Sequence, residues 1–342
     1  MNNGSVILVG GPASGKTNYI ARLWLAFQAR KGALRADQLP KKIQYVDDAV
    51  KHLMARKFAP RSERNMEDGR RDFSIEVRGN GGFGAARNLS VPDITGELWK
   101  RAVNTYELPQ EWIDELRASS SAILFVRAFT RLNVQPMDWV TTRDILKLHA
   151  EKLEEAGALE DEDEDEDCEG ENLDTPDPVP ASKVALVVHE ENEPQANLSP
   201  VANSSDNQVA PSAELPAQVG FCELLRYLGL LLSERPDGAK PRVAIIVTAW
   251  DMLDPATKAA GPMKYLEKQF PLLAGRIATP SRLEIQTFGM SIVGGNMRKN
   301  PAFCESLKGK DLSDVGYTAI MRNGTVVEDT DVTLPVAWAI GD

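Results

Sequence analysis

The residue types best suited to chemistry stand together near the start of the chain, in GGPASGKT. This run matches the pattern GxxxxGK[ST], with an apolar strand expected before it at residues 5–9 and an amphipathic helix after it at 17–31. In such a loop the backbone N–H groups and the helix N-terminus surround a phosphate group. We therefore predict that the nucleotide is bound by Gly10, Gly11, Pro12, Ala13, Ser14, Gly15, Lys16, Thr17 and Asn18. The Lys16 ammonium would neutralise phosphate oxygens as a catalytic group, and the Thr17 hydroxyl would coordinate Mg²⁺.

A second motif, DITGE, follows an apolar strand expected to end at Asp93. Its DxxG spacing is typical of loops in which the acid holds Mg²⁺ and the glycine N–H contacts the γ-phosphate, here Asp93 and Gly96. Glu97 would orient the attacking water, although an acid in the first turn of a helix is an alternative interpretation. Ser62 is the candidate for a further Mg²⁺ ligand, with an ordinary polar loop as the alternative.

The run RVAIIVTAWD (residues 242–251) places an acid after an apolar strand, where two roles are open. In an ATPase the acid at the strand end holds Mg²⁺, whereas in a GTPase the acid of an [N/T]KxD pattern reads guanine. Three residues separate the apolar run from Asp251, which favours the guanine role, with Thr248 bracing the loop. Ala249 replaces the usual lysine, and we expect Trp250 to cover the base in its place.

Two further sequences are judged by their position in the chain. FGMS follows the last predicted core strand and offers a backbone N–H at Ser291 for guanine O6. The glycines of GNGGFG form a GxGxxG pattern, but a strand rather than a helix is expected after it. We therefore interpret that loop as the tip of a β-hairpin and not as a dinucleotide site.

Strand-like and helix-like segments alternate along the chain, which predicts an α/β three-layer sheet of the P-loop NTPase type with helices on both faces. A helix is expected at 139–156, just before the run EDEDEDEDCEGE (160–171), which holds ten acids and no base. The stretch 151–217 is acidic and then rich in Pro, Ser and Asn, a composition typical of disorder. We predict one discontinuous domain, 1–150 and 218–342, interrupted by this insertion.

Composition excludes several classes of protein. The formal net charge is −11, and the acidic run accounts for most of it. No basic face favours nucleic acid, and no apolar run is long enough for a membrane span. The three isolated cysteines and the absence of a signal-like N-terminus favour a cytoplasmic location.

Taken in order, GGPASGKT, DITGE, TAWD and FGMS resemble the motifs of TRAFAC-class GTPases, most closely those of the bacterial double-GTPase family. The closing PVAWAI is similar to the C-terminal end of that family. The resemblance implies binding of GTP or GDP with Mg²⁺, GTP hydrolysis as a molecular switch, and protein partners in a bacterial conflict or defence system. Because the sequence offers no secure arginine finger, we expect slow intrinsic turnover unless a partner supplies one.

Two other functions stay open on the sequence alone. A P-loop ATPase or kinase would use Asp93 or Asp251 on Mg²⁺, with Arg127 and Arg131 as the hint of a lid. A scaffold that binds nucleotide without turnover would use the acidic insertion to recruit a basic partner.

Overall fold

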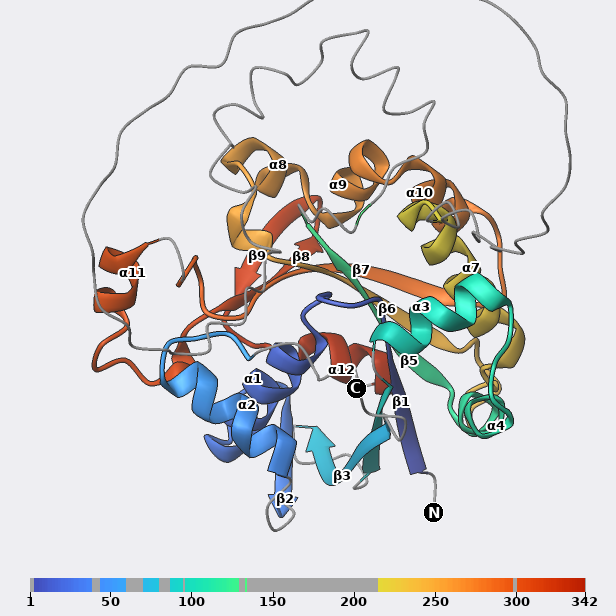
Figure 1. Cartoon of the computed structure of the whole chain (residues 1–342), viewed down its shortest axis with the longest axis horizontal. Coiled ribbons are helices and arrows are strands. Elements are labelled where there is room, and N and C mark those ends of the chain that lie inside the picture. The colour runs from blue at the N-terminus through green and yellow to red at the C-terminus, as the bar shows by residue number, and fades with distance from the viewer. Residues whose placement is uncertain are drawn as a thin grey trace, which may run out of the picture.

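The strands expected from the sequence join into one sheet in the computed structural model, which describes residues 3–38, 44–59, 70–79, 87–94, 96–128, 133, 215–297 and 300–341 (Figure 1). Within these residues the sheet has nine strands in the order β2-β3-β4-β1-β5-β6-β7-β8-β9. The strands are β1 (Asn3–Val9), β2 (Leu34–Gln38), β3 (Arg70–Gly79), β4 (Arg87–Ile94), β5 (Ser121–Arg127), β6 (Arg242–Thr248), β7 (Glu284–Ser291), β8 (Tyr317–Arg322) and β9 (Thr325–Asp329).

The centre of the sheet is parallel. Strand β1 runs parallel to β4 on one side and to β5 on the other, and β5, β6 and β7 continue the parallel arrangement. The register places Asp93 of β4 opposite Leu8, and Thr248 of β6 opposite both Arg127 and Met290. The carboxyl ends of these strands therefore meet at one edge, which is where parallel α/β sheets bind ligands.

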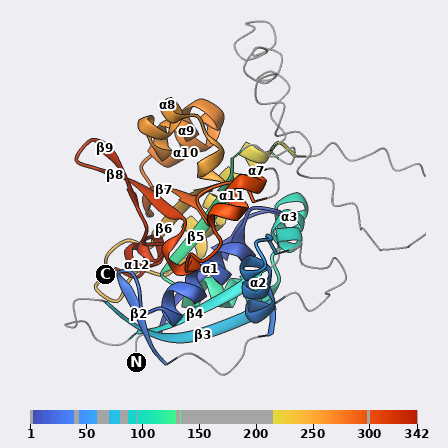
Figure 2. The same cartoon turned by 90° about the vertical axis from the view of Figure 1, so that its left-hand side faces the viewer.

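Helices cover both faces of this parallel centre, as Figures 1 and 2 show. Along β1, Val6 and Leu8 pack in a core with α1, α2 and α12, whereas Ile7 and Val9 pack in a core with α3, α4, α7, α9 and α10. This burial on both faces explains the continuous apolar run of the strand. The helices are α1 (Lys16–Gln28), α2 (Gln44–Met54), α3 (Gly96–Thr105), α4 (Gln110–Ala118), α7 (Ala217–Leu231), α8 (Pro255–Ala260), α9 (Pro262–Gln269), α10 (Pro271–Ala278), α11 (Pro301–Ser306) and α12 (Leu334–Ile340).

Antiparallel strands extend the sheet at both edges. Strands β3 and β4 pair antiparallel, which confirms the hairpin predicted around GNGGFG. Strands β8 and β9 form a second hairpin, with Asn323 at φ 51° and Gly324 at φ 79° in its turn. Two consecutive positive φ angles are what the preferred two-residue hairpin turn requires, and Asn-Gly supplies them.

The predicted three-layer α/β fold is confirmed. Strand β2 and helices α8, α10, α11 and α12 were not expected, because each is short and has little periodicity of its own. The helix predicted at 139–156 and the acidic part of the predicted insertion lie outside the described residues. None of the helices within the described ranges has the length and apolar character that crossing a bilayer would need.

Candidate nucleotide-binding site

The phosphate-binding loop joins the end of β1 to the start of α1, as the sequence predicts. Helix α1 begins at Lys16, which is 7% exposed and bends back over the loop. Its Nζ donates to the carbonyl oxygens of Gly10 and Gly11 at 2.8 and 3.2 Å, and lies 3.4 Å from Ser14 Oγ. The ammonium is thus held within the loop that would receive a phosphate.

Two residues from neighbouring strands hold two further carbonyl groups of the loop. Thr248 Oγ1, at the end of β6, donates to the Ser14 carbonyl oxygen at 2.9 Å. Arg127 Nη1, at the end of β5, donates to the Ala13 carbonyl oxygen at 3.1 Å. Because side chains engage these carbonyl oxygens, an anion entering the loop would meet backbone N–H groups instead, as in known phosphate-binding loops.

Arg127, at the end of β5, contacts this loop although sequence reasoning did not assign it to the site. It was expected only as a possible part of a kinase lid, whereas the structure ties it to the phosphate-binding loop. Strand pairing places it beside Thr248, whose carbonyl oxygen accepts a hydrogen bond from Ala128 N at 3.1 Å. One feature of the sequence could have indicated this role: Arg127 is a cationic residue at the last position of β5, a strand parallel to β1.

The DITGE motif lies against the phosphate-binding loop. A Cβ atom added at Gly96 would stand 2.4 Å from the backbone C and O atoms of Gly11 and from Pro12 N, so only glycine fits. Trp99, one turn later on α3, is buried and donates from Nε1 to the Leu8 carbonyl oxygen at 3.1 Å. Trp99, which sequence reasoning missed, thereby anchors α3 to β1 and keeps Gly96 at the loop.

The remaining residues predicted near the phosphates have different positions. Glu97 lies in the first turn of α3, and Asp93 is paired in register with Leu8. Asn18 Oδ1 accepts a hydrogen bond from Ala59 N at 2.9 Å, so its side chain holds the segment that precedes Ser62. Ser62 itself lies outside the described residues.

The TAWD sequence forms a tight turn after β6. Ala249 has φ 56°, and a short 3-10 helix, η2, covers Trp250–Met252. The Trp250 ring is 0% exposed and packs against Tyr265, with ring centroids 6.0 Å apart, and against Gly289 of β7. The expectation that this ring covers a base is therefore corrected: burial leaves it no free face, and it supports the turn from inside the core.

Asp251 and Ser291 stand at the ends of neighbouring strands, because Thr248 and Met290 are paired in register. The Asp251 backbone carbonyl oxygen accepts a hydrogen bond from Lys258 Nζ at 2.9 Å. Ser291 is 1% exposed, and its Oγ accepts a hydrogen bond from Gly294 N at 2.9 Å, which closes the turn after β7. The two sequences expected at a base therefore lie side by side at the edge where the phosphate-binding loop also lies.

The site brings together the motifs in the order and geometry of a nucleotide-binding α/β protein. A sequence model of the family described as Double-GTPase 1 matches residues 7–339, from within β1 to within α12. The match includes GGPASGKT, DITGE, TAWD and FGMS. No curated protein matches the chain. The chain belongs to the Double-GTPase 1 family, whose name indicates binding of a guanine nucleotide and hydrolysis of GTP.

Proposed function

We propose that this protein is a Mg²⁺-dependent GTPase that acts as a molecular switch, with its nucleotide bound between the phosphate-binding loop and the loops after β6 and β7. The observation that carries the proposal is the contact of two further motifs, DITGE and TAWD, with the phosphate-binding loop. Gly96 lies against the backbone of Gly11 and Pro12, and Thr248 bonds the carbonyl oxygen of Ser14. A loop contacted by both motifs can register whether a γ-phosphate is present and which base is bound.

The oxygen groups near the loop suit Mg²⁺, which prefers hard oxygen ligands and retains several waters. Thr17 stands in the first turn of α1, and Asp93 lies near the end of β4, the strand beside β1. We propose these two as ligands or water-mediated ligands, with Ser62 as a third. When bound, Mg²⁺ would neutralise charge on the phosphate oxygens.

The reaction we propose is in-line attack of water on the γ-phosphate of GTP. The backbone N–H groups of the loop residues other than Pro12, together with the Lys16 ammonium, would hold the β- and γ-phosphate oxygens and stabilise charge on them. Glu97 would orient the attacking water from the first turn of α3. Loss of the γ-phosphate would remove the contact to Gly96 N, so α3 is the element that responds to hydrolysis.

We expect slow intrinsic turnover. The Arg127 guanidinium bonds the Ala13 carbonyl oxygen, and the carboxylate of Glu97 adds negative charge close to the proposed position of the γ-phosphate. Phosphoryl transfer depends on neutralising that charge, and a partner protein that supplies a cation would accelerate it. We propose such a partner, a cytoplasmic location and a role in a bacterial conflict or defence system on the basis of the family resemblance.

Calorimetry with GTP, GDP, ATP and ADP in the presence of Mg²⁺ tests the proposal. We expect tight binding of GTP and GDP, weak binding of ATP and ADP, and release of phosphate from GTP. Asp251→Ala should remove the guanine preference, while Asp254→Ala should keep it, because Asp254 caps α8 three residues later. Equal affinity for ATP and GTP in the wild-type protein would favour the ATPase or kinase alternative.

The variant Gly96→Ala tests whether the protein is a GTP-hydrolysing switch or a scaffold that binds nucleotide without turnover. The added Cβ would push the start of α3 away from Gly11, so phosphate release from GTP should fall at least about tenfold while GDP affinity changes little. Stoichiometric GTP binding by the wild-type protein without phosphate release over hours would favour the scaffold.

A further inference from the structure

The loop after β7 is braced by a segment far along the chain, residues 311–317, which we call the strut. The strut contains the 3-10 helix η3 (Leu312–Asp314) and ends at the first residue of β8. Strand pairing sets Tyr317 opposite Ser291, so the strut meets β7 at the point where the predicted guanine-reading loop begins.

Contact between the strut and this loop is made backbone to backbone. A Cβ atom added at Gly316 would stand 2.3 Å from the Ile292 carbonyl oxygen and 2.5 Å from the Ser291 carbonyl oxygen. Atoms this close to backbone cannot be accommodated by rotating a side chain. The position of Gly316 therefore sets the position of the Ser291–Ile292 backbone.

The strut also approaches the second base-reading loop. Burial, followed by the nearby carboxylates of Glu328 and Asp251, raises the pKa of the Tyr317 phenol. Consecutive residues of the strut thus lie against the loop that carries Ser291 and close to Asp251.

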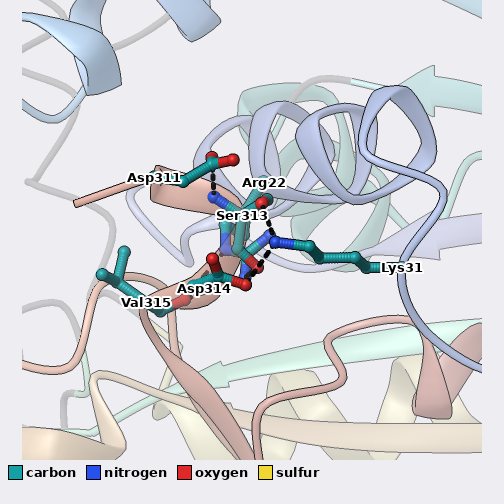
Figure 3. Close-up of polar contacts among 6 residues, drawn as sticks. All are labelled: Arg22, Lys31, Asp311, Ser313, Asp314 and Val315. Carbon is teal, nitrogen blue, oxygen red and sulfur yellow. Dashed lines mark hydrogen bonds and ion pairs between the residues drawn. The ribbon is translucent and has the colours of Figure 1, made fainter.

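A buried arginine fixes the strut to α1, the helix that begins at Lys16. Arg22 is 1% exposed; its Nη2 donates to the carbonyl oxygens of Ser313 and Val315, both at 2.8 Å, and its Nε donates to Val315 at 3.1 Å (Figure 3). At the surface, Lys31 Nζ donates to Ser313 Oγ at 2.9 Å and pairs with Asp314. Helix α1, which begins at the phosphate end of the site, is therefore bonded directly to the strut at the base end.

The burial of Arg22 is costly for a purely structural contact. Desolvation lowers the pKa of its guanidinium to about 10, against the opposing effect of Asp314, Asp311 and Asp331. Within the described part of the chain its Nη1 has no hydrogen-bond partner. An apolar side chain of similar volume at this position would avoid that desolvation. Unlike an apolar side chain, the guanidinium donates hydrogen bonds to two carbonyl groups of the strut and so fixes their positions.

We propose that Arg22 and Gly316 are positioning residues for guanine recognition, holding the backbone after β7 where it can donate to guanine O6. This inference rests on the guanine-binding function proposed above. It makes a specific distinction: the strut governs recognition at O6, whereas Asp251 governs recognition at the 2-amino group.

Two nucleotide pairs report on these contacts separately. 6-Thio-GDP replaces O6 by sulfur, a weaker acceptor, and retains N1–H and the 2-amino group. IDP lacks the 2-amino group and retains O6. We expect the wild-type protein to prefer GDP over 6-thio-GDP by about threefold to tenfold, the range of one neutral hydrogen bond. The preference for GDP over IDP should be larger, about 10- to 100-fold, because the 2-amino group would donate to the charged Asp251 carboxylate.

Gly316→Ala should abolish the preference for GDP over 6-thio-GDP and leave the preference for GDP over IDP unchanged. Gly309→Ala is the matched control: Gly309 has φ 79° and Gly316 has φ 77°, so backbone strain is alike, but nothing lies within 4 Å of a Cβ at Gly309. Arg22→Lys, which retains charge and a donor, should reduce the 6-thio-GDP preference partially. If thermal unfolding shows that Gly316→Ala is not folded, Arg22→Lys is used in its place to test the proposal.

The outcomes are distinguishable from failure of the proposed function. If the wild-type protein binds ADP as tightly as GDP, the guanine-binding function fails. If it prefers GDP over ADP and 6-thio-GDP, and folded Gly316→Ala or Arg22→Lys retains the full 6-thio-GDP preference, the strut does not position the loop and the inference is overturned.

Discussion

The phosphate end of the site is built mostly from consecutive residues, whereas the base end is assembled from three distant parts of the chain. Lys16 bonds the carbonyl oxygens of its own loop, and single contacts from β5 and β6 complete the loop. The base end combines the turn after β6, the loop after β7 and the strut. Substitutions at the phosphate end should therefore weaken every nucleotide, and substitutions at the base end should change which nucleotide is preferred.

The largest effect is expected at the phosphate end, from Lys16→Ala. Removing the ammonium removes the charge that would meet the phosphates and the two bonds that hold Gly10 and Gly11. We expect affinity for GTP and GDP to fall at least about 100-fold, measured by calorimetry. Lys51→Ala, which removes an exposed lysine of α2, should bind normally. Normal binding by Lys16→Ala would contradict the phosphate site.

A change of preference rather than a general loss is expected from Asp251→Asn at the base end. The carboxylate can only accept hydrogen bonds, from guanine N1–H and the 2-amino group, whereas the amide can also donate to the O2 of xanthine. We expect GDP affinity to fall by about 10- to 100-fold and XDP affinity to rise. Competition binding with both nucleotides measures this, and equal loss of both would show that Asp251 does not read the base.

A smaller effect, independent of the base, is expected from Arg127→Ala. One hydrogen bond to the Ala13 carbonyl oxygen is lost, so GDP and IDP should both weaken by about threefold to tenfold while their ratio stays constant. A changed GDP/IDP ratio would place Arg127 at the base end instead.

The smallest effect is expected at the outer end of the strut, from Asp311→Ala. Asp311 Oδ1 accepts a hydrogen bond from Ser313 N at 2.8 Å, and this bond lowers the pKa of the carboxyl group. Loss of such a cap should reduce the free energy of unfolding by about 0.5–1 kcal/mol at neutral pH. Because the folded pKa is lowered, the contribution is present above the ordinary pKa and is lost as the pH falls through the folded value. Urea unfolding at pH 7 and in acid should show the difference between wild type and variant disappearing in acid.

Sequence reasoning predicted the phosphate end of the site better than the base end. The loop at 10–17 was predictable because one short segment contains the glycines, the lysine and both flanking elements. Trp250 was assigned wrongly because its partners, Tyr265 and Gly289, stand far along the chain and nothing near TAWD reveals them. Arg22 belongs to the helix expected at 17–31 and was not recognised, since its partners are backbone carbonyl groups of the strut.

The sequence by itself determined the three-layer fold, the family and the loop that joins β1 to α1, because periodicity and local motifs act over a few residues. The tertiary structure alone decided that Arg127 braces that loop, that Trp250 belongs to the core, and that the strut lies against Ser291 and Ile292. Each of these depends on which strands pair and on how closely two backbones approach. Such distances follow from the packing of the whole sheet and leave no periodic trace in the chain.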